Sequence, residues 1–242
     1  MTASVFISTE AIETGRTYWW LRLDYAWHHA RHHRAEVTLP DQAPAVLDWG
    51  NVDSLRQLKA LLRRTEARAR EAAVDSIESQ LKAKLEDPTT QYPYASIMTW
   101  ADARKLVSAG FDVGSHTVSH PNLALLSTEE ARRELSASKT AIERETQTAC
   151  AHFCYPYGSF SAATEAAVRE SGYAAATSTI GPGLNRVGES LFALRRYAMP
   201  ADPWKLGYIL SGFPRLFSSS PSISGVRQER VALPEAGAPE LL

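Results

Sequence analysis

The sequence has little of several features that would place a protein in a special class. Its 242 residues include two cysteines, too few for a disulfide framework, and no apolar run approaches the ~20 residues of a membrane span. Lys and Arg (26) nearly balance Asp and Glu (27), and a formal net charge of −1 argues against a general nucleic-acid binder. Residues 1–7 lack the basic start of a signal peptide. We expect a cytoplasmic globular protein, unless the true amino terminus lies upstream.

Two further absences concern chemistry. No Asp-Asp pair occurs anywhere in the chain, and no histidine follows His152. The composition is otherwise ordinary, with 44% hydrophobic and 22% charged residues, as in globular proteins. This length suffices for one large domain or two small ones.

The second half of the chain alternates between helix and strand patterns. A helix from Thr99 to Ala109 precedes a strand at 111–115, and Ser127 with Glu130 forms a capping box for a helix to about Glu145. We expect a helix at 161–171 and strands at 152–155, 173–178 and 192–198. Such alternation predicts parallel strands joined by crossover helices, and it leaves both a barrel and an open doubly wound sheet as alternatives.

The first half is less regular. We expect a strand at 2–9, a helix at 18–33, a loop at 38–52 and one long helix from about 53 to 86. Asp202-Pro203 is expected to open a last helix, and periodicity is lost after residue 217.

The most informative motif is His-Thr-Val-Ser-His at residues 116–120, directly after an expected strand. Two imidazoles four residues apart can meet one metal ion if the segment forms a turn, and imidazole nitrogen suits zinc and its neighbours. The alternative is a pair of solvated or hydrogen-bonded polar residues. Small hydroxyl side chains within and beside the motif are candidates for supporting hydrogen bonds.

A second motif, Phe-Cys-Tyr-Pro-Tyr-Gly at 153–158, ends another expected strand. Such a turn can direct a backbone N–H, here that of Tyr157, at a developing oxyanion. Alone it also fits an ordinary strand-to-helix turn. The histidines at 28–33, the cysteines Cys150 and Cys154, and the aromatic cluster at 18–20 are better explained by a solvated face and by core packing.

Together, Gly-Ser-His-Thr-Val-Ser-His-Pro at 114–121 and the turn at 153–158 resemble the polysaccharide deacetylases, the NodB-homology domains of carbohydrate esterase family 4. The resemblance implies an α/β fold, a distorted (β/α)7 TIM-like barrel that is incomplete at the amino terminus. It implies a domain at 1–216 with a helical insertion at about 18–98, and we expect a disordered tail at 217–242.

The resemblance also implies the chemistry, which is metal-dependent hydrolysis of N-acetyl groups on the amino sugars of a polysaccharide or other glycan. His116 and His120 would be ligands of a divalent metal, zinc first among the candidates. Tyr157 would act catalytically through its backbone N–H, and Tyr155 and Pro156 would contact substrate.

The chain departs from the family pattern at the metal ligands, the base and the acid. The third ligand and the general base come from a first-strand Asp-Asp motif that would precede Thr2, and the late histidine that serves as general acid has no counterpart. Because loss of a general base costs about 10²–10⁴-fold in rate, we expect a poor or inactive deacetylase. Glu10 is an alternative third ligand. A non-catalytic glycan- or partner-binding relic, and a different barrel amidohydrolase, are the competing hypotheses.

Overall fold

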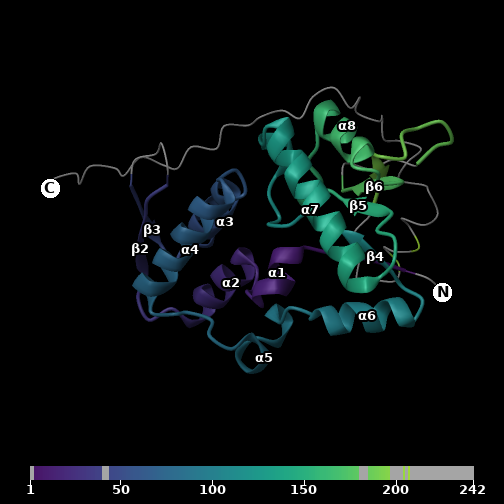
Figure 1. The fold of residues 1–242 in the computed structure, drawn as a ribbon. Coiled ribbons are helices and arrows are strands. Elements are labelled where there is room, and N and C mark those ends of the chain that lie inside the picture. Colours follow the sequence, from purple (N-terminus) through teal and green to yellow (C-terminus); the bar gives the residue numbers. More distant parts are fainter. Residues whose placement is uncertain (1–2, 40–43, 180–184, 197–203, 205–206, 208–242) are drawn as a thin grey trace, which may run out of the picture. The chain divides into compact units, whose positions relative to one another are not determined.

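The computed structural model describes residues 3–39, 44–179, 185–196, 204 and 207 (Figure 1). They fall into two compact units. The first combines residues 3–10 with those from Thr99 onward, and the second lies between Ala11 and Met98. Among the described residues, no helix is long and apolar enough to cross a membrane.

The first unit is built on a five-stranded parallel sheet with the strand order β1-β4-β5-β6-β7. The strands are β1 (Ser4–Ile7), β4 (Asp112–Ser115), β5 (His152–Cys154), β6 (Ala175–Ser178) and β7 (Leu194–Arg195). The α/β class with a parallel sheet is therefore confirmed. In the described part of the chain the strands form an open sheet, with β1 and β7 at its two edges.

Helices α6 (Trp100–Ser108), α7 (Thr128–Thr146) and α8 (Ala162–Glu170) connect these strands, and α7 lies between the other two (Figure 1). The predicted caps are confirmed: Thr99 forms a capping box with Asp102, and Ser127 forms one with Glu130. The apolar side chains that α7 and α8 turn inward are fully buried with those of the sheet. They include Leu135, Ile142, Phe153, Val168 and Ala176.

The second unit combines helices with a small antiparallel hairpin. After α1 (Thr9–Thr14), which begins where β1 ends, its elements are α2 (Trp19–His29), β2 (Arg34–Val37), β3 (Ala45–Asp48), α3 (Val52–Leu62), α4 (Ala67–Leu81), α5 (Pro88–Gln91) and a 3-10 turn (Pro93–Ala95). The expected loop at 38–52 is thus partly wrong, because β3 lies inside it and pairs with β2. The alternating burial of β2, with Ala35 and Val37 inward, is the signal that indicates this strand.

The single long helix expected at about 53–86 is also wrong. It is divided at residues 63–66, where α3 ends and Glu66 begins α4. The carboxylate of Glu66 accepts hydrogen bonds from the backbone N–H groups of Arg68 and Ala69, both at 2.9 Å. An acidic side chain that satisfies two free N–H groups stabilises a new helix start, so two amphipathic helices replace one.

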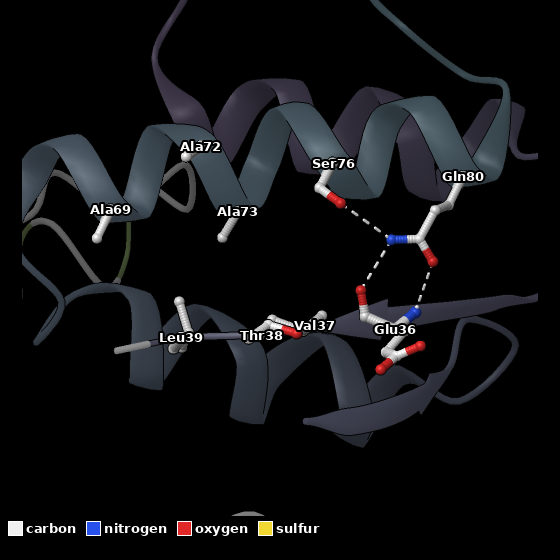
Figure 2. Close-up of a pocket in the computed structure, with 9 residues that line it drawn as sticks. All are labelled: Glu36, Val37, Thr38, Leu39, Ala69, Ala72, Ala73, Ser76 and Gln80. Atoms are coloured by element: carbon white, nitrogen blue, oxygen red, sulfur yellow. Dashed lines mark hydrogen bonds between the residues drawn. The ribbon is translucent and has the colours of Figure 1, made fainter. Parts of the chain in front are cut away.

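Figure 2 shows how α4 covers the outer edge of β2. Gln80 bonds the backbone of Glu36 twice, since its Oε1 accepts the N–H at 2.8 Å and its Nε2 donates to the carbonyl at 2.8 Å. Beside this contact lies a cavity of about 680 Å³, floored by small side chains of α4 such as Ala69 and Ala73. No histidine or cysteine lines this cavity, so it is separate from the predicted metal ligands.

The remaining expectations fall at the carboxyl-terminal end. The strand expected at 192–198 is described only to residue 196, and within that range the structure has β7 at Leu194–Arg195. The helix expected after Asp202 and the tail at 217–242 lie outside the described residues, apart from Trp204 and Gly207.

Candidate metal centre

The two predicted motifs follow the carboxyl ends of neighbouring strands. β4 and β5 pair in parallel, with Ser115 opposite Phe153. His116 comes directly after β4, and the turn at 155–158 comes directly after β5. Because parallel strands end at the same edge of a sheet, this pairing brings both motifs to one place, where α/β proteins build their sites.

The first histidine is held in a defined tautomer. The His116 Nδ1 lies 2.6 Å from the Cys154 carbonyl oxygen, which only accepts, so Nδ1 carries the hydrogen. The Nε2 lone pair is then available for a metal ion, and a backbone carbonyl is a common second partner for a ligating imidazole. Burial lowers the pKa of His116 to about 4, against the hydrogen bond to the Cys154 carbonyl, which raises it; the positive charge of Arg196 makes a smaller contribution that also lowers the pKa. The imidazole is therefore neutral at pH 7, the form that binds metal.

The second histidine lies beside the first. The ring centroids of His116 and His120 are 4.7 Å apart, and the His120 ring also packs edge-on against Tyr157 at 4.8 Å. His120 is buried, and its backbone N–H donates to the Thr117 Oγ1 at 3.0 Å. The turn thus places both imidazoles on one side of the chain, as the four-residue spacing predicts.

The turn between the histidines has an unusual backbone. Thr117 has φ 71° and His120 has φ 54°, the left-handed region that a β-branched residue such as Thr117 rarely adopts. The Thr117 hydroxyl also donates to the His116 carbonyl, so one side chain bonds the backbone at both ends of the turn. Strained conformations of this kind persist where surrounding bonds enforce them, and they cluster at functional sites.

The neighbouring strand and helices supply those enforcing bonds. Ser8, which follows β1, donates its hydroxyl to the His116 carbonyl at 3.0 Å, and the Thr9 N–H donates to the Thr117 carbonyl at 3.2 Å. The buried hydroxyls of Ser115 and Ser138 lie 2.7 Å apart. The expectation that small hydroxyls support the site is met at Ser115 and Thr117.

Sequence reasoning missed Glu134, which accepts three hydrogen bonds from the turn. It lies on α7, 14 residues beyond His120, and nothing in the motif points to it. A signal was available in the helix pattern. Ala131, Leu135 and Ser138 form the buried face of α7, and position 134 lies at the edge of that face.

The turn after β5 carries the predicted oxyanion donor. Tyr157 has φ 58° inside the 3-10 turn Pro156–Gly158, and Gly158 has φ 68°. Ser178, at the end of β6, donates its hydroxyl to the Gly158 carbonyl at 2.6 Å. Two successive left-handed residues turn the peptide planes sharply, and this is how a turn presents a backbone N–H to a ligand.

The side chain of Tyr155 has a different position from the one expected for a substrate contact. It is 1% exposed, its ring is stacked on Phe160, and its hydroxyl donates to the Phe192 carbonyl at 3.0 Å. Pro156 is buried as well. An enclosed aromatic ring packs in the core, and the predicted substrate contacts of Tyr155 and Pro156 stay predictions.

Arg195 and Arg196, two neighbouring arginines to which the sequence assigns no role, have different partners in the structure. Arg195 pairs with Glu189 at 2.8 Å. The Arg196 guanidinium lies 2.9 Å from the Cys154 Sγ and over the Phe6 ring. A positive charge from the residue after β7 therefore reaches the end of β5, close to His116.

The described residues supply two histidines and no further ligand. Among them, no three His, Cys, Asp or Glu side chains are grouped closely enough to hold a metal ion. Glu10 is therefore not brought to the pair as a third ligand. The histidines at 28–33 are likewise not part of any group of three ligating side chains. Cys150 and Cys154 are free and buried, and burial raises the pKa of the Cys150 thiol to about 12. Two imidazoles fit a first-row divalent cation and provide half of a tetrahedral zinc set.

The comparisons with known proteins agree with this geometry. The sequence model of the family described as polysaccharide deacetylase matches residues 47–176, more than half of the chain, including both motifs. The chain belongs to the polysaccharide deacetylase family. Its described residues form an open parallel sheet with connecting helices, so the barrel that the resemblance implied is not closed among them. Among curated proteins, none matches this deacetylase-family chain.

Several solved structures are similar over part of the chain. A polysaccharide deacetylase from Bacillus cereus is 26% identical over 42% of this chain and 32% of its own, with a TM-score of 0.39. A CE4 family pseudoenzyme from Bacillus anthracis is 28% identical over 32% of this chain and 27% of its own, with a TM-score of 0.31. IcaB from Ammonifex degensii is 20% identical over 46% of this chain and 52% of its own, with a TM-score of 0.42. This family member thus spans about half or less of each structure's length.

Proposed function

We propose that this protein acts on an N-acetylated polysaccharide by metal-dependent deacetylation, with His116 and His120 as two ligands of the metal. The supporting observation is the bond from His116 Nδ1 to the Cys154 carbonyl. It leaves Nε2 of a neutral imidazole with a free lone pair, and the His120 ring lies beside it, with 4.7 Å between the ring centroids. A backbone carbonyl is a common partner for the second ring nitrogen of a metal-ligating histidine.

The residues divide the work as follows. A bound zinc or similar cation would supply Lewis-acid polarisation of the acetyl carbonyl and acidify a water molecule. His116 and His120 would bind and orient that cation. The Tyr157 backbone N–H would donate to the negative charge that develops on the acetyl carbonyl oxygen. The buried Tyr155 and Pro156 would fix the direction of that N–H. The Arg196 guanidinium would favour negative charge near His116.

We further propose that the 242-residue chain by itself deacetylates slowly or not at all. The sequence has no Asp-Asp pair, and the described residues bring no carboxylate to the histidines. A site without a general base is expected to lose about 10²–10⁴-fold in rate. Strong zinc-dependent release of acetate from N-acetylated amino-sugar oligomers by the purified chain would contradict this.

The lack of a carboxylate beside the two histidines among the described residues also favours a second candidate, a non-catalytic glycan-binding protein. The two functions separate in one experiment, which measures zinc affinity and the affinity for an N-acetylated oligomer with and without zinc. Deacetylase chemistry predicts measurable zinc binding by the wild type and its loss in a His116→Ala/His120→Ala double variant. His152→Ala is the matched control, because this histidine instead pairs with Asp112 at 2.7 Å. Oligomer binding that persists in the double variant, without zinc binding by the wild type, would favour the binding protein.

A further inference from the structure

One carboxylate of α7 binds the turn that joins the two histidines. Glu134 Oε2 accepts the backbone N–H groups of Val118 at 2.8 Å and Ser119 at 3.0 Å, and Glu134 Oε1 accepts the Ser119 hydroxyl at 2.7 Å. All three donors lie between His116 and His120. Bonds from N–H and O–H groups to an ionised carboxylate are about twice as strong as neutral ones.

We propose that Glu134 is a positioning residue that sets the geometry of the metal-binding turn. This inference rests on the proposed function, since it assigns Glu134 to the same pair of histidines. The turn contains Thr117 and His120 in the left-handed region, so its free peptide would favour other conformations. Glu134 bonds only the middle of the turn, whereas Thr117 bonds its two ends.

The rigidity of α7 makes Glu134 an effective anchor. Leu135 beside it is fully buried, and Ser138, one turn farther on, is buried against Ser115 of β4. The helix is thus fixed to the strand that leads into His116. Glu134 then fixes the chain that follows His116, so the residues before and after this histidine are both bonded to α7.

The chemistry of the three bonds suggests graded variants. In Glu134→Gln the amide oxygen can occupy the Oε2 position and still accept both N–H groups, and the Ser119 hydroxyl can reverse to accept from the amide nitrogen. Glu134→Ala removes all three acceptors, and Ser119→Ala removes one bond. Glu129→Ala is the matched control, because Glu129 lies on the same helix, is 69% exposed and only pairs with Arg133.

The test measures amide hydrogen exchange in the metal-free full chain and zinc affinity of the same variants. Glu134→Ala should speed exchange of the Val118 and Ser119 amides by about tenfold or more, with α8 unchanged. It should weaken zinc binding by about 10–100-fold. Glu134→Gln should fall between Glu134→Ala and the wild type, and Glu129→Ala should match the wild type. With cobalt(II) as probe, the visible spectrum should change in Glu134→Ala and not in Glu129→Ala.

Two results would overturn the positioning role. One is unchanged exchange at Val118 and Ser119 in Glu134→Ala. The other is faster exchange there with zinc affinity and cobalt spectrum equal to those of the wild type. Failure of the wild type itself to bind zinc would instead overturn the proposed function. If Glu134→Ala does not fold, Glu134→Gln and Ser119→Ala carry the same comparison with smaller changes.

Discussion

Replacing Gly158 by alanine tests whether the turn after β5 depends on close contact with the end of β6. Gly158 has φ 68°, and a Cβ added there would lie 2.1 Å from the Thr179 Oγ1 and 2.8 Å from the Thr179 backbone nitrogen. The hydroxyl can rotate away. The backbone nitrogen cannot move without displacing the chain that follows β6, so the turn and β6 must separate.

The magnitude follows from two separate costs. An alanine in the left-handed region costs about 1–2 kcal/mol. Forcing a methyl group into a filled space costs about 1–3 kcal/mol more. Gly172→Ala is the matched control, because Gly172 has φ 76° and nothing within 4 Å of an added Cβ. We expect it to show only the first cost, whereas Gly158→Ala should lose about 2–5 kcal/mol in total.

The assay should report on the first unit alone, since the chain has two units. Hydrogen exchange of β5 and β6 amides across a urea series gives the free energy of opening for those strands. Both glycines change to alanine, so effects on the unfolded chain cancel in the comparison. Equal losses in the two variants would refute the steric reasoning. A loss at Gly158 that leaves β6 exchange unchanged would show that the turn yields without disturbing the strand.

Two further predictions follow from buried charge. The imidazole of His116 takes up its proton near pH 6.5 in the unfolded chain and near pH 4 in the folded one. The free energy of unfolding should therefore be complete above pH 6.5 and fall by about 3 kcal/mol as the pH drops to 4. NMR titration of the His116 ring measures the folded pKa and acid denaturation measures the loss of stability; a ring titration midpoint near pH 6.5 would contradict the prediction. In the second unit, Glu78→Ala leaves the guanidinium of Arg22 buried without the carboxylate that accepts its Nε–H at 3.0 Å. We expect the free energy of unfolding in urea to fall by about 3 kcal/mol. Asp75 also pairs with Arg22 but is half-exposed, so Asp75→Ala should cost less than about 1 kcal/mol; equal losses would show that the buried pair contributes nothing beyond a surface one.

The fold was predictable where local signals and tertiary packing agree. From residue 99 onward, capping residues, helix-ending glycines and short apolar runs give the helices and strands to within a few residues. In the second unit the signals conflict. The leucines spaced along 55–85 fit one continuous helix, and only the hydrogen bonds of Glu66 show where it divides. The β2–β3 hairpin follows a histidine-rich segment with ambiguous periodicity, so its alternation is visible only once Ala35 and Val37 are seen to be buried.

The site was predictable to the extent that motifs carry it. The spacing of His116 and His120 is enough to place two rings side by side, because the motif itself forms the turn. Supports that come from elsewhere were not predictable. Glu134 and Arg196 reach the site from a helix and from beyond a strand that are distant in sequence. The pattern of α7 places Glu134 at the edge of a buried face, but it does not show which groups the carboxylate contacts. Tyr155, which the motif suggests as a substrate contact, is buried and stacked on Phe160, and its sequence position alone does not show this packing.

The strain and the supports of the histidine turn together indicate how metal affinity is limited in this chain. Each left-handed residue costs about 1–3 kcal/mol, and Thr117 and His120 both lie in that region. The bonds from Ser8, Thr117 and Glu134 offset this cost within the protein. A site whose ligands are already arranged does not lose affinity to ordering the chain, so weak binding, if measured, would reflect the number of ligands. Adding a carboxylate ligand should then raise affinity far more in the wild type than in Glu134→Ala, where the turn must also be ordered.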